Sequence, residues 1–151
     1  MVSEKLLELL NRGIARELQV SIQYMWQSIQ VTGIEGEIAR GIFRRIAISE
    51  MKHAEILAER LDYLDGVATI KPDPIDVGAS LIEMLKHDEE NEEEAITLYK
   101  EAIQVADKEG DYTTRRLLEK ILSEEESHIN TFGKMLVGMT EPFTQPGIST
   151  L

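Results

Sequence analysis

The chain of 151 residues lacks cysteine altogether and has only three histidines. The absence of cysteine excludes disulfide bonds, cysteine zinc sites and thiol chemistry, and it fits a cytoplasmic protein. Aromatic residues are few, at 5% of the chain. No run of about 18 apolar residues occurs, so we expect no membrane-spanning segment. The first residues also lack the pattern of a secretory signal peptide.

Positive charge is scarce as well. The 16 Lys and Arg are outnumbered by 28 Asp and Glu, and the resulting net charge of −12 disfavours nucleic acid and anionic lipid as partners. The same charge is compatible with attracting cations. At this length the chain suits one domain with a core large enough to fold unaided.

Apolar residues recur at helical spacing in four segments, and they predict helices over residues 3–32, 36–64, 78–107 and 111–138. Ser3 is a good N-cap, and the glycines at 33 and 36 offer a tight turn between the first two helices. Residues 66–78 contain two prolines and no helical period, so we expect a connection there. Residues 141–151 contain two more prolines and are expected to form an extended tail.

The length of the connection decides the topology. Its extended reach of about 43–47 Å matches the length of about 42 Å expected for a helix of roughly 28 residues. The connection can therefore return along the whole bundle and leave the second and third helices parallel. We predict an all-α fold, a four-helix bundle of two antiparallel hairpins joined by one long crossover between helices 2 and 3.

An internal repeat becomes visible when the sequence is shifted by 75 residues. Residues 1–75 and 76–150 then align as two copies of one helical hairpin, related by an approximate two-fold axis. The polar residues that coincide are Glu17 with Glu92, Tyr24 with Tyr99, Glu50 with Glu125, and His53 with His128.

These polar residues lie on the apolar, inward faces of their helices. Glu92 shares its face with Leu85 and Ile96, whereas Glu93 and Glu94 are rotated by roughly 100° and 200° towards solvent. Four carboxylates and two imidazoles thus converge, and each unpaired buried ion would cost at least several kcal/mol. Two divalent metals would supply four positive charges against four negative ones. The predicted ligands are Glu17, Glu50, His53, Glu92, Glu125 and His128.

A set of four carboxylates and two imidazoles around a pair of ions suits iron or manganese, and iron is the first choice. A single Glu-x-x-His is more often a surface pair, but two copies in register with two further inward Glu make that interpretation weak. A metal-free polar network is also disfavoured, because six such groups offer few donors. Tyr24 and Tyr99 are either core tyrosines or groups that bond to the metal carboxylates.

The segments "RELQVSIQYMW", "EMKHAE" and "EAIQVADKEGDYTTRRLLEKILSEEESHI" resemble the ferritin-like di-iron carboxylate proteins, and bacterioferritin most of all. The likeness covers residues 1–140 and implies a ferritin-like bundle whose internal repeat builds one di-iron centre. It implies that Glu17 and Glu92 are terminal ligands, that Glu50 and Glu125 bridge the metals, and that His53 and His128 complete the site. These six residues would be catalytic.

The activity implied is that of a ferroxidase, which oxidises Fe(II) with O2 or H2O2 in iron uptake, storage or detoxification. The resemblance also implies a homo-oligomer, at least a dimer, with a cage as the larger form. In bacterioferritin a Met directly after the bridging Glu ligates haem between two subunits, and Met51 has that place here. Met51 is therefore a candidate ligand of haem b, or else a residue packed in a dimer interface.

Two departures from bacterioferritin leave alternatives open. The tail at 141–151 replaces a short fifth helix, which puts the storage cage in doubt; it would dock on a partner or neighbouring subunit. Glu89, one turn before Glu92, is similar to the extra ligand of rubrerythrins, although a solvated Glu is the simpler interpretation. The alternative function is thus a rubrerythrin- or symerythrin-like di-iron peroxidase that acts as a dimer, and a non-enzymatic bundle is a third. His87 has no repeat partner and is expected at the surface.

Overall fold

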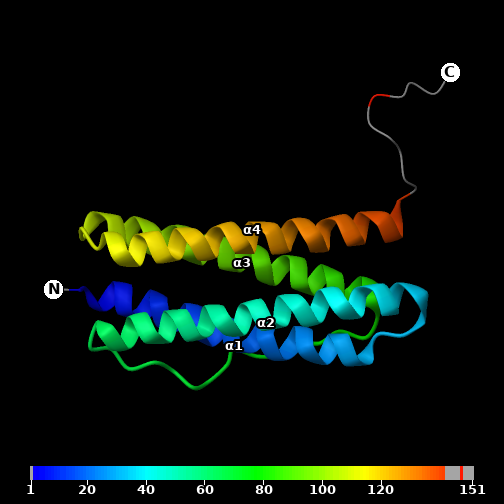
Figure 1. Cartoon of the computed structure of the whole chain (residues 1–151), viewed down its shortest axis with the longest axis horizontal. Helices are drawn as coiled ribbons and strands as arrows, with labels where there is room; N and C mark the ends of the chain where they lie inside the picture. The colour runs from blue at the N-terminus through cyan, green and yellow to red at the C-terminus, as the bar shows by residue number, and fades with distance from the viewer. Residues whose placement is uncertain (1, 142–146, 148–151) are drawn as a thin grey trace.

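The computed structural model describes residues 2–141 and Gly147. Its four helices are α1 (Glu4–Gln30), α2 (Gly33–Tyr63), α3 (Leu81–Lys108) and α4 (Tyr112–Thr140). They lie along one common axis, as the hairpin α1–α2 beside the hairpin α3–α4, and the crossover returns along the bundle so that α2 and α3 run in the same direction (Figure 1). The predicted fold is confirmed. None of these described helices combines the length and apolar character that crossing a bilayer needs.

Two helix starts differ from the prediction. Helix α2 begins at Gly33 rather than at residue 36, because extended Thr32 and the positive φ of 78° at Gly33 turn the chain in fewer residues. Helix α3 begins at Leu81 rather than at residue 78, because the hydroxyl of Ser80 accepts a hydrogen bond from the Glu83 N–H and caps the helix there. Ser3 caps α1 as predicted, accepting from the Leu6 N–H at 3.1 Å.

The apolar core is divided into two clusters along the bundle. One cluster surrounds Leu6, Leu10, Leu57 and Leu118, near the ends where α2 stops and α4 starts. The other cluster includes Val20, Tyr24, Phe43, Leu85 and Phe132, towards the opposite end. The six predicted ligands occupy the chain positions between these clusters on all four helices. Apolar layers on both sides therefore shield the middle of the bundle from water.

The crossover is fastened to α1 by side chains of that helix. The amide of Asn11 donates to the Val67 carbonyl at 2.9 Å and accepts from the Thr69 N–H at 2.8 Å. Further along, the Gln27 amide donates to the Val77 carbonyl at 2.9 Å. These bonds hold a long connection that has no hydrogen-bond ladder of its own, and they satisfy three of its backbone polar groups.

A buried acid that the sequence did not single out lies beneath this connection. Asp88 of α3 is fully buried, and its Oδ1 accepts from the amides of Gln23 and Gln27 at 2.9 and 2.8 Å. Its Oδ2 has no hydrogen-bond partner among the described residues. Burial raises the pKa of Asp88 to about 8, although the two amide bonds act in the opposite direction.

We predict that Asp88→Asn stabilises the protein above about pH 8 and flattens the pH dependence of its unfolding. The pKa of Asp88 is higher in the folded chain than in the unfolded one, so the folded state holds the extra proton. Stability is therefore lost as pH rises from the unfolded pKa near 4 towards 8, by at most about 1.4 kcal/mol per pH unit. Urea unfolding of metal-free protein across this range measures the slope. Asp62→Asn, at an exposed position of α2, is the matched control, and equal slopes in both variants and the wild type would contradict the prediction.

Candidate metal centre

The six predicted ligands come together at the middle of the bundle. Their donor atoms form two groups, and within each group all atoms lie within 4.8 Å of one another. The first group is Glu17, Glu50, His53 and Glu125, and the second is Glu50, Glu92, Glu125 and His128. Glu50 and Glu125 belong to both groups, so the arrangement has the form of two adjacent cation positions with two shared carboxylates.

Both histidines turn the same ring nitrogen towards the carboxylates. Nδ1 of His53 lies 2.8 Å from an oxygen of Glu50 and 2.8 Å from an oxygen of Glu125. Nδ1 of His128 lies 2.9 Å from Oε1 of Glu50, and the two rings stack with centroids 6.0 Å apart. On its outer side, Nε2 of His53 contacts the carboxylate of Glu124. A carboxylate in this position fixes the ring orientation and leaves Nδ1 free to ligate.

The two tyrosines cross from one repeat to the other. The hydroxyl of Tyr24 on α1 donates to Glu92 of α3 at 2.6 Å, and the hydroxyl of Tyr99 on α3 donates to Glu17 of α1. Burial and the neighbouring carboxylates raise the pKa of both phenols well above the usual value, so they stay protonated and act as donors. Each tyrosine thereby orients the carboxylate that belongs to one group alone.

The electrostatics of the cluster favour a cation. Burial, together with the charges of Glu17 and Glu92, raises the pKa of Glu50 and Glu125 well above the ordinary range. Several buried carboxylate oxygens receive no well-directed hydrogen bond from a described residue, namely Glu50 Oε2, Glu92 Oε2 and both oxygens of Glu125, although His53 Nδ1 lies 2.8 Å from two of them. Buried carboxylate oxygens of this kind, next to imidazole nitrogens, are a donor set that fits iron or manganese.

Arg16 is a member of the site that the sequence reasoning missed. Its guanidinium is 4% exposed and lies 3.4 Å from Glu17, 3.6 Å from Glu125 and 3.8 Å from Glu92. Its remaining donors bond to the Asn91 carbonyl at 2.6 and 3.0 Å. Burial is the largest influence on the pKa of Glu92 and raises it, but the Arg16 charge acts together with Glu125, His128 and Tyr24 and leaves this pKa below the ordinary value. The repeat pairs Arg16 with Asn91, and each directly precedes an inward Glu. A charged residue in one repeat where the other has a neutral one was the sequence signal that could have revealed the role of Arg16.

The candidates Glu89 and Met51, and His87, which was expected at the surface, lie outside the two groups. Glu89 is partly buried and its carboxylate lies over Gly133 of α4, where a Cβ would come within 3.3 Å. Met51 is 45% exposed and borders an apolar pocket that α1, α2 and the crossover form, outside the metal-ligand cluster. His87 is partly exposed near Asp76, with 3.4 Å between Nδ1 and the carboxylate.

A four-helix bundle with this crossover and a central carboxylate–histidine cluster defines the ferritin-like class. The profile of the family described as "Ferritin-like domain" matches residues 7–140, and the chain belongs to this family. A bacterioferritin of Desulfovibrio desulfuricans is 35% identical over 130 residues, which are 85% of this chain and 72% of that protein. A bacterioferritin of Brucella melitensis is 32% identical over 129 residues, or 83% and 79% of the two chains. A bacterial ferritin of Synechocystis is 42% identical over 89 residues, or 58% and 57%.

We predict that Arg16→Met lowers the free energy of unfolding of the metal-free protein by about 3 kcal/mol, because it leaves buried carboxylates without their counter-charge. Manganese(II) should reduce the difference in the free energy of unfolding between the variant and the wild type, since divalent ions neutralise the same carboxylates. Thermal unfolding with a chelator and with excess manganese measures both effects. Arg12→Met, at an exposed position one turn earlier on α1, is the control. A metal-free Arg16 variant as stable as this control would refute the assigned role.

Proposed function

We propose that this protein is a bacterioferritin-like ferroxidase that binds two Fe(II) ions as substrate and oxidises them with O2 or H2O2. The observation that carries the proposal is the pair of donor groups that share Glu50 and Glu125. In the reaction each Fe(II) loses one electron, and the two electrons reduce O2 to H2O2 or H2O2 to water. The activity would serve iron uptake, storage or detoxification. The names of the relatives, bacterioferritin and bacterial ferritin, support it.

Each site residue has a defined task in this proposal. Glu17 and His53 hold one ion, Glu92 and His128 hold the other, and the shared Glu50 and Glu125 bridge them. Because burial raises the pKa of both bridging carboxyls, they release protons when the ions bind, so metal affinity falls as pH falls. The tyrosines keep the terminal carboxylates in place, and the apolar clusters exclude water. Manganese would fit the same donors.

We predict that Glu50→Gln reduces the rate of Fe(II) oxidation at least about tenfold, because it removes a carboxylate that both donor groups use. Stopped-flow absorbance after mixing ferrous protein with O2 measures the rate, and titration with cobalt(II) under argon counts the ions bound. Glu126→Gln is the control, since it removes the same charge from an exposed position of α4. Equal rates in the two variants would refute the assigned centre.

The second candidate is a rubrerythrin- or symerythrin-like peroxidase working as a dimer, with Glu89 as an extra ligand. The partly buried position of Glu89, one turn before Glu92, favours it. Repeating the oxidation with H2O2 in place of O2 separates the candidates. A strong preference for peroxide with no ferric mineral favours the peroxidase, and light scattering tells a dimer from a cage.

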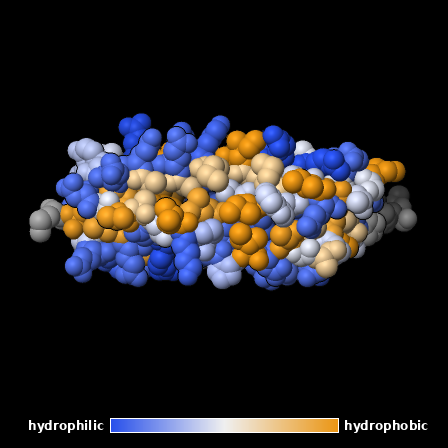
Figure 2. Space-filling view, turned by 90° about the horizontal axis from the view of Figure 1, so that it is seen from below, coloured by the Kyte–Doolittle hydropathy of each residue, from blue (hydrophilic) through white to orange (hydrophobic). Residues whose placement is uncertain are grey.

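The face that carries Met51 is the proposed contact between two copies of the chain. Figure 2 shows apolar side chains gathered on the side of the molecule formed by α1, α2 and the crossover. The exposed residues Met51 and Ile70 border one pocket that α1, α2 and the crossover form. The pocket beside Met51 has a volume of about 520 Å³ and is lined by Ile14, Leu18 and Ala58 among others. An apolar pocket with an exposed thioether at its edge suits a haem between two subunits.

We predict that protein produced in haem-replete cells carries haem b and that Met51→Leu loses it. Leucine keeps the apolar volume but removes the sulfur that would ligate iron. The Soret band relative to protein concentration is the measurement. Met139→Leu, on α4, is the control. A Soret band of unchanged position and size in the Met51 variant would exclude Met51 as the ligand.

A further inference from the structure

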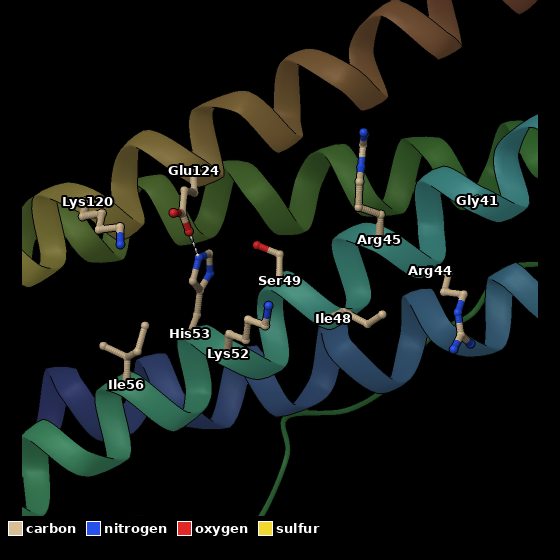
Figure 3. Close-up of a pocket in the computed structure, with 10 residues that line it drawn as sticks. All are labelled: Gly41, Arg44, Arg45, Ile48, Ser49, Lys52, His53, Ile56, Lys120 and Glu124. Carbon is tan, nitrogen blue, oxygen red and sulfur yellow. Dashed lines mark hydrogen bonds and ion pairs between the residues drawn. The ribbon is translucent and has the colours of Figure 1, made fainter.

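A carboxylate outside the two donor groups contacts one of the ligand histidines. Glu124 reaches down from α4 to the ring of His53, which rises from α2, and both residues line a pocket of about 590 Å³ between these helices (Figure 3). The Glu124 side chain is 43% exposed and the His53 side chain only 1% exposed. This contact therefore joins a partly exposed carboxylate to the buried metal centre.

The contact determines which nitrogen of His53 carries the proton. Nδ1 is the atom that faces Glu50 and Glu125, at 2.8 Å from each, so a neutral ring that ligates there carries its proton on Nε2. Nε2 is the nitrogen that contacts Glu124, and its N–H donates to that carboxylate. A carboxylate that accepts from a metal-bound imidazole holds the ring in its ligating orientation and makes the other nitrogen a stronger ligand.

The internal repeat does not supply this contact to the second histidine. The shift of 75 residues places Ser49 at the position equivalent to Glu124, directly before a shared Glu and four residues before a histidine in each case. Because Glu124 contacts the histidine of the other repeat, position 49 faces His128 by the same symmetry. Ser49 is neutral and shorter. Among the residues that the structure describes, no hydrogen bond joins it to His128 or reaches Nε2 of that ring.

The other polar contacts of the centre are similar for the two ion positions. Each terminal carboxylate accepts one tyrosine hydroxyl from the other repeat. The guanidinium of Arg16 lies 3.4 Å from Glu17 and 3.8 Å from Glu92, so its charge opposes a cation at both positions to a similar degree. The contact of Glu124 is thus the difference that separates the two positions.

We propose that Glu124 is a positioning residue for His53 and makes the ion position of Glu17 and His53 the tighter of the two. The proposal rests on the function proposed above, because it concerns the order in which the same two positions fill. Loss of a group that orients a ligand histidine typically lowers metal affinity about tenfold to a hundredfold. The first Fe(II) therefore binds beside His53, and the position of Glu92 and His128 fills second.

Titration of metal-free protein with cobalt(II) under argon tests the proposal, with the visible absorption of bound cobalt and the heat of binding as readouts. The wild type should bind two ions. Glu124→Gln should lower the product of the two association constants at least about tenfold, because the ring of His53 loses its charged acceptor. Glu126→Gln, which removes the same charge from an exposed position of α4, is the control and should titrate as the wild type does.

A carboxylate added beside the second histidine should have the opposite effect. Ser49→Glu gives His128 the acceptor that His53 already has, so the product of the two association constants should rise at least about tenfold. This gain cannot come from a damaged fold. Asn130→Glu, which adds the same charge at an exposed position of α4, is the control and should bind cobalt as the wild type does.

Ligand variants show whether Glu124 acts through His53. His53→Asn should weaken binding of the first ion more than His128→Asn does, and Glu124→Gln should have no further effect in the His53→Asn background. Circular dichroism and thermal unfolding check that each variant is folded.

Three results would each overturn the proposal: a Glu124→Gln variant that titrates like Glu126→Gln, an equal effect of Glu124→Gln in the His53→Asn background, or a Ser49→Glu variant no tighter than Asn130→Glu. In all three cases the wild type still binds two ions and the proposed ferroxidase stands. A wild type that does not bind a pair of cobalt ions contradicts the proposed function itself.

Discussion

The burial of four carboxylates in the middle of a small helical bundle is the constraint that the rest of this structure serves. The free energy of a carboxylate is lower in water than in an apolar core. Each buried carboxylate must therefore be neutralised by a cation or a proton, or accept hydrogen bonds from donors. Tyr24 and Tyr99 supply donors to two of them and Arg16 supplies one fixed positive charge. Burial and the neighbouring carboxylates raise the pKa of Glu50 and Glu125, which favours the protonated form of these two until a metal cation binds. Burying these carboxylates without enough positive charge is unfavourable, and this unfavourable state favours the binding of divalent ions.

The approximate two-fold symmetry of the repeat is broken at places that matter for chemistry. Arg16 stands opposite Asn91, and Asp88 stands opposite Gly13. Gly13 leaves room for the Tyr99 ring, because a Cβ there would lie 3.1 Å from a ring carbon, a tight contact. At the histidines, Glu124 contacts His53, whereas its repeat equivalent Ser49 carries no charge. The two cation positions are therefore chemically unequal. The position beside His53 has the additional carboxylate and lies next to the pocket between α2 and α4.

The fold and the six converging residues could be predicted from the sequence because both depend on periodicity. Helical spacing places Glu92 among Leu85 and Ile96, and the repeat shows the same pattern twice. Arg16, Glu124 and Asp88 were missed for a physical reason. Arg16 and Asp88 are buried, and Glu124 is half-exposed but contacts His53. The contacts of all three depend on how closely neighbouring helices approach, and spacing along a single helix does not contain that information. The start of α2 was wrong because a positive φ at Gly33 allows a turn shorter than the two glycines suggested.

The distribution of charge follows from the same constraint. On the proposed function the product is ferric iron, which carries more charge than the substrate, and carboxylates along the whole of its route would retain it. The α2–α4 gap has the opposite character, with Arg45, Lys52 and Lys120 next to the single carboxylate of Glu124. Fixed cations there would repel a metal ion, whereas the Glu124 carboxylate that contacts His53 would attract one.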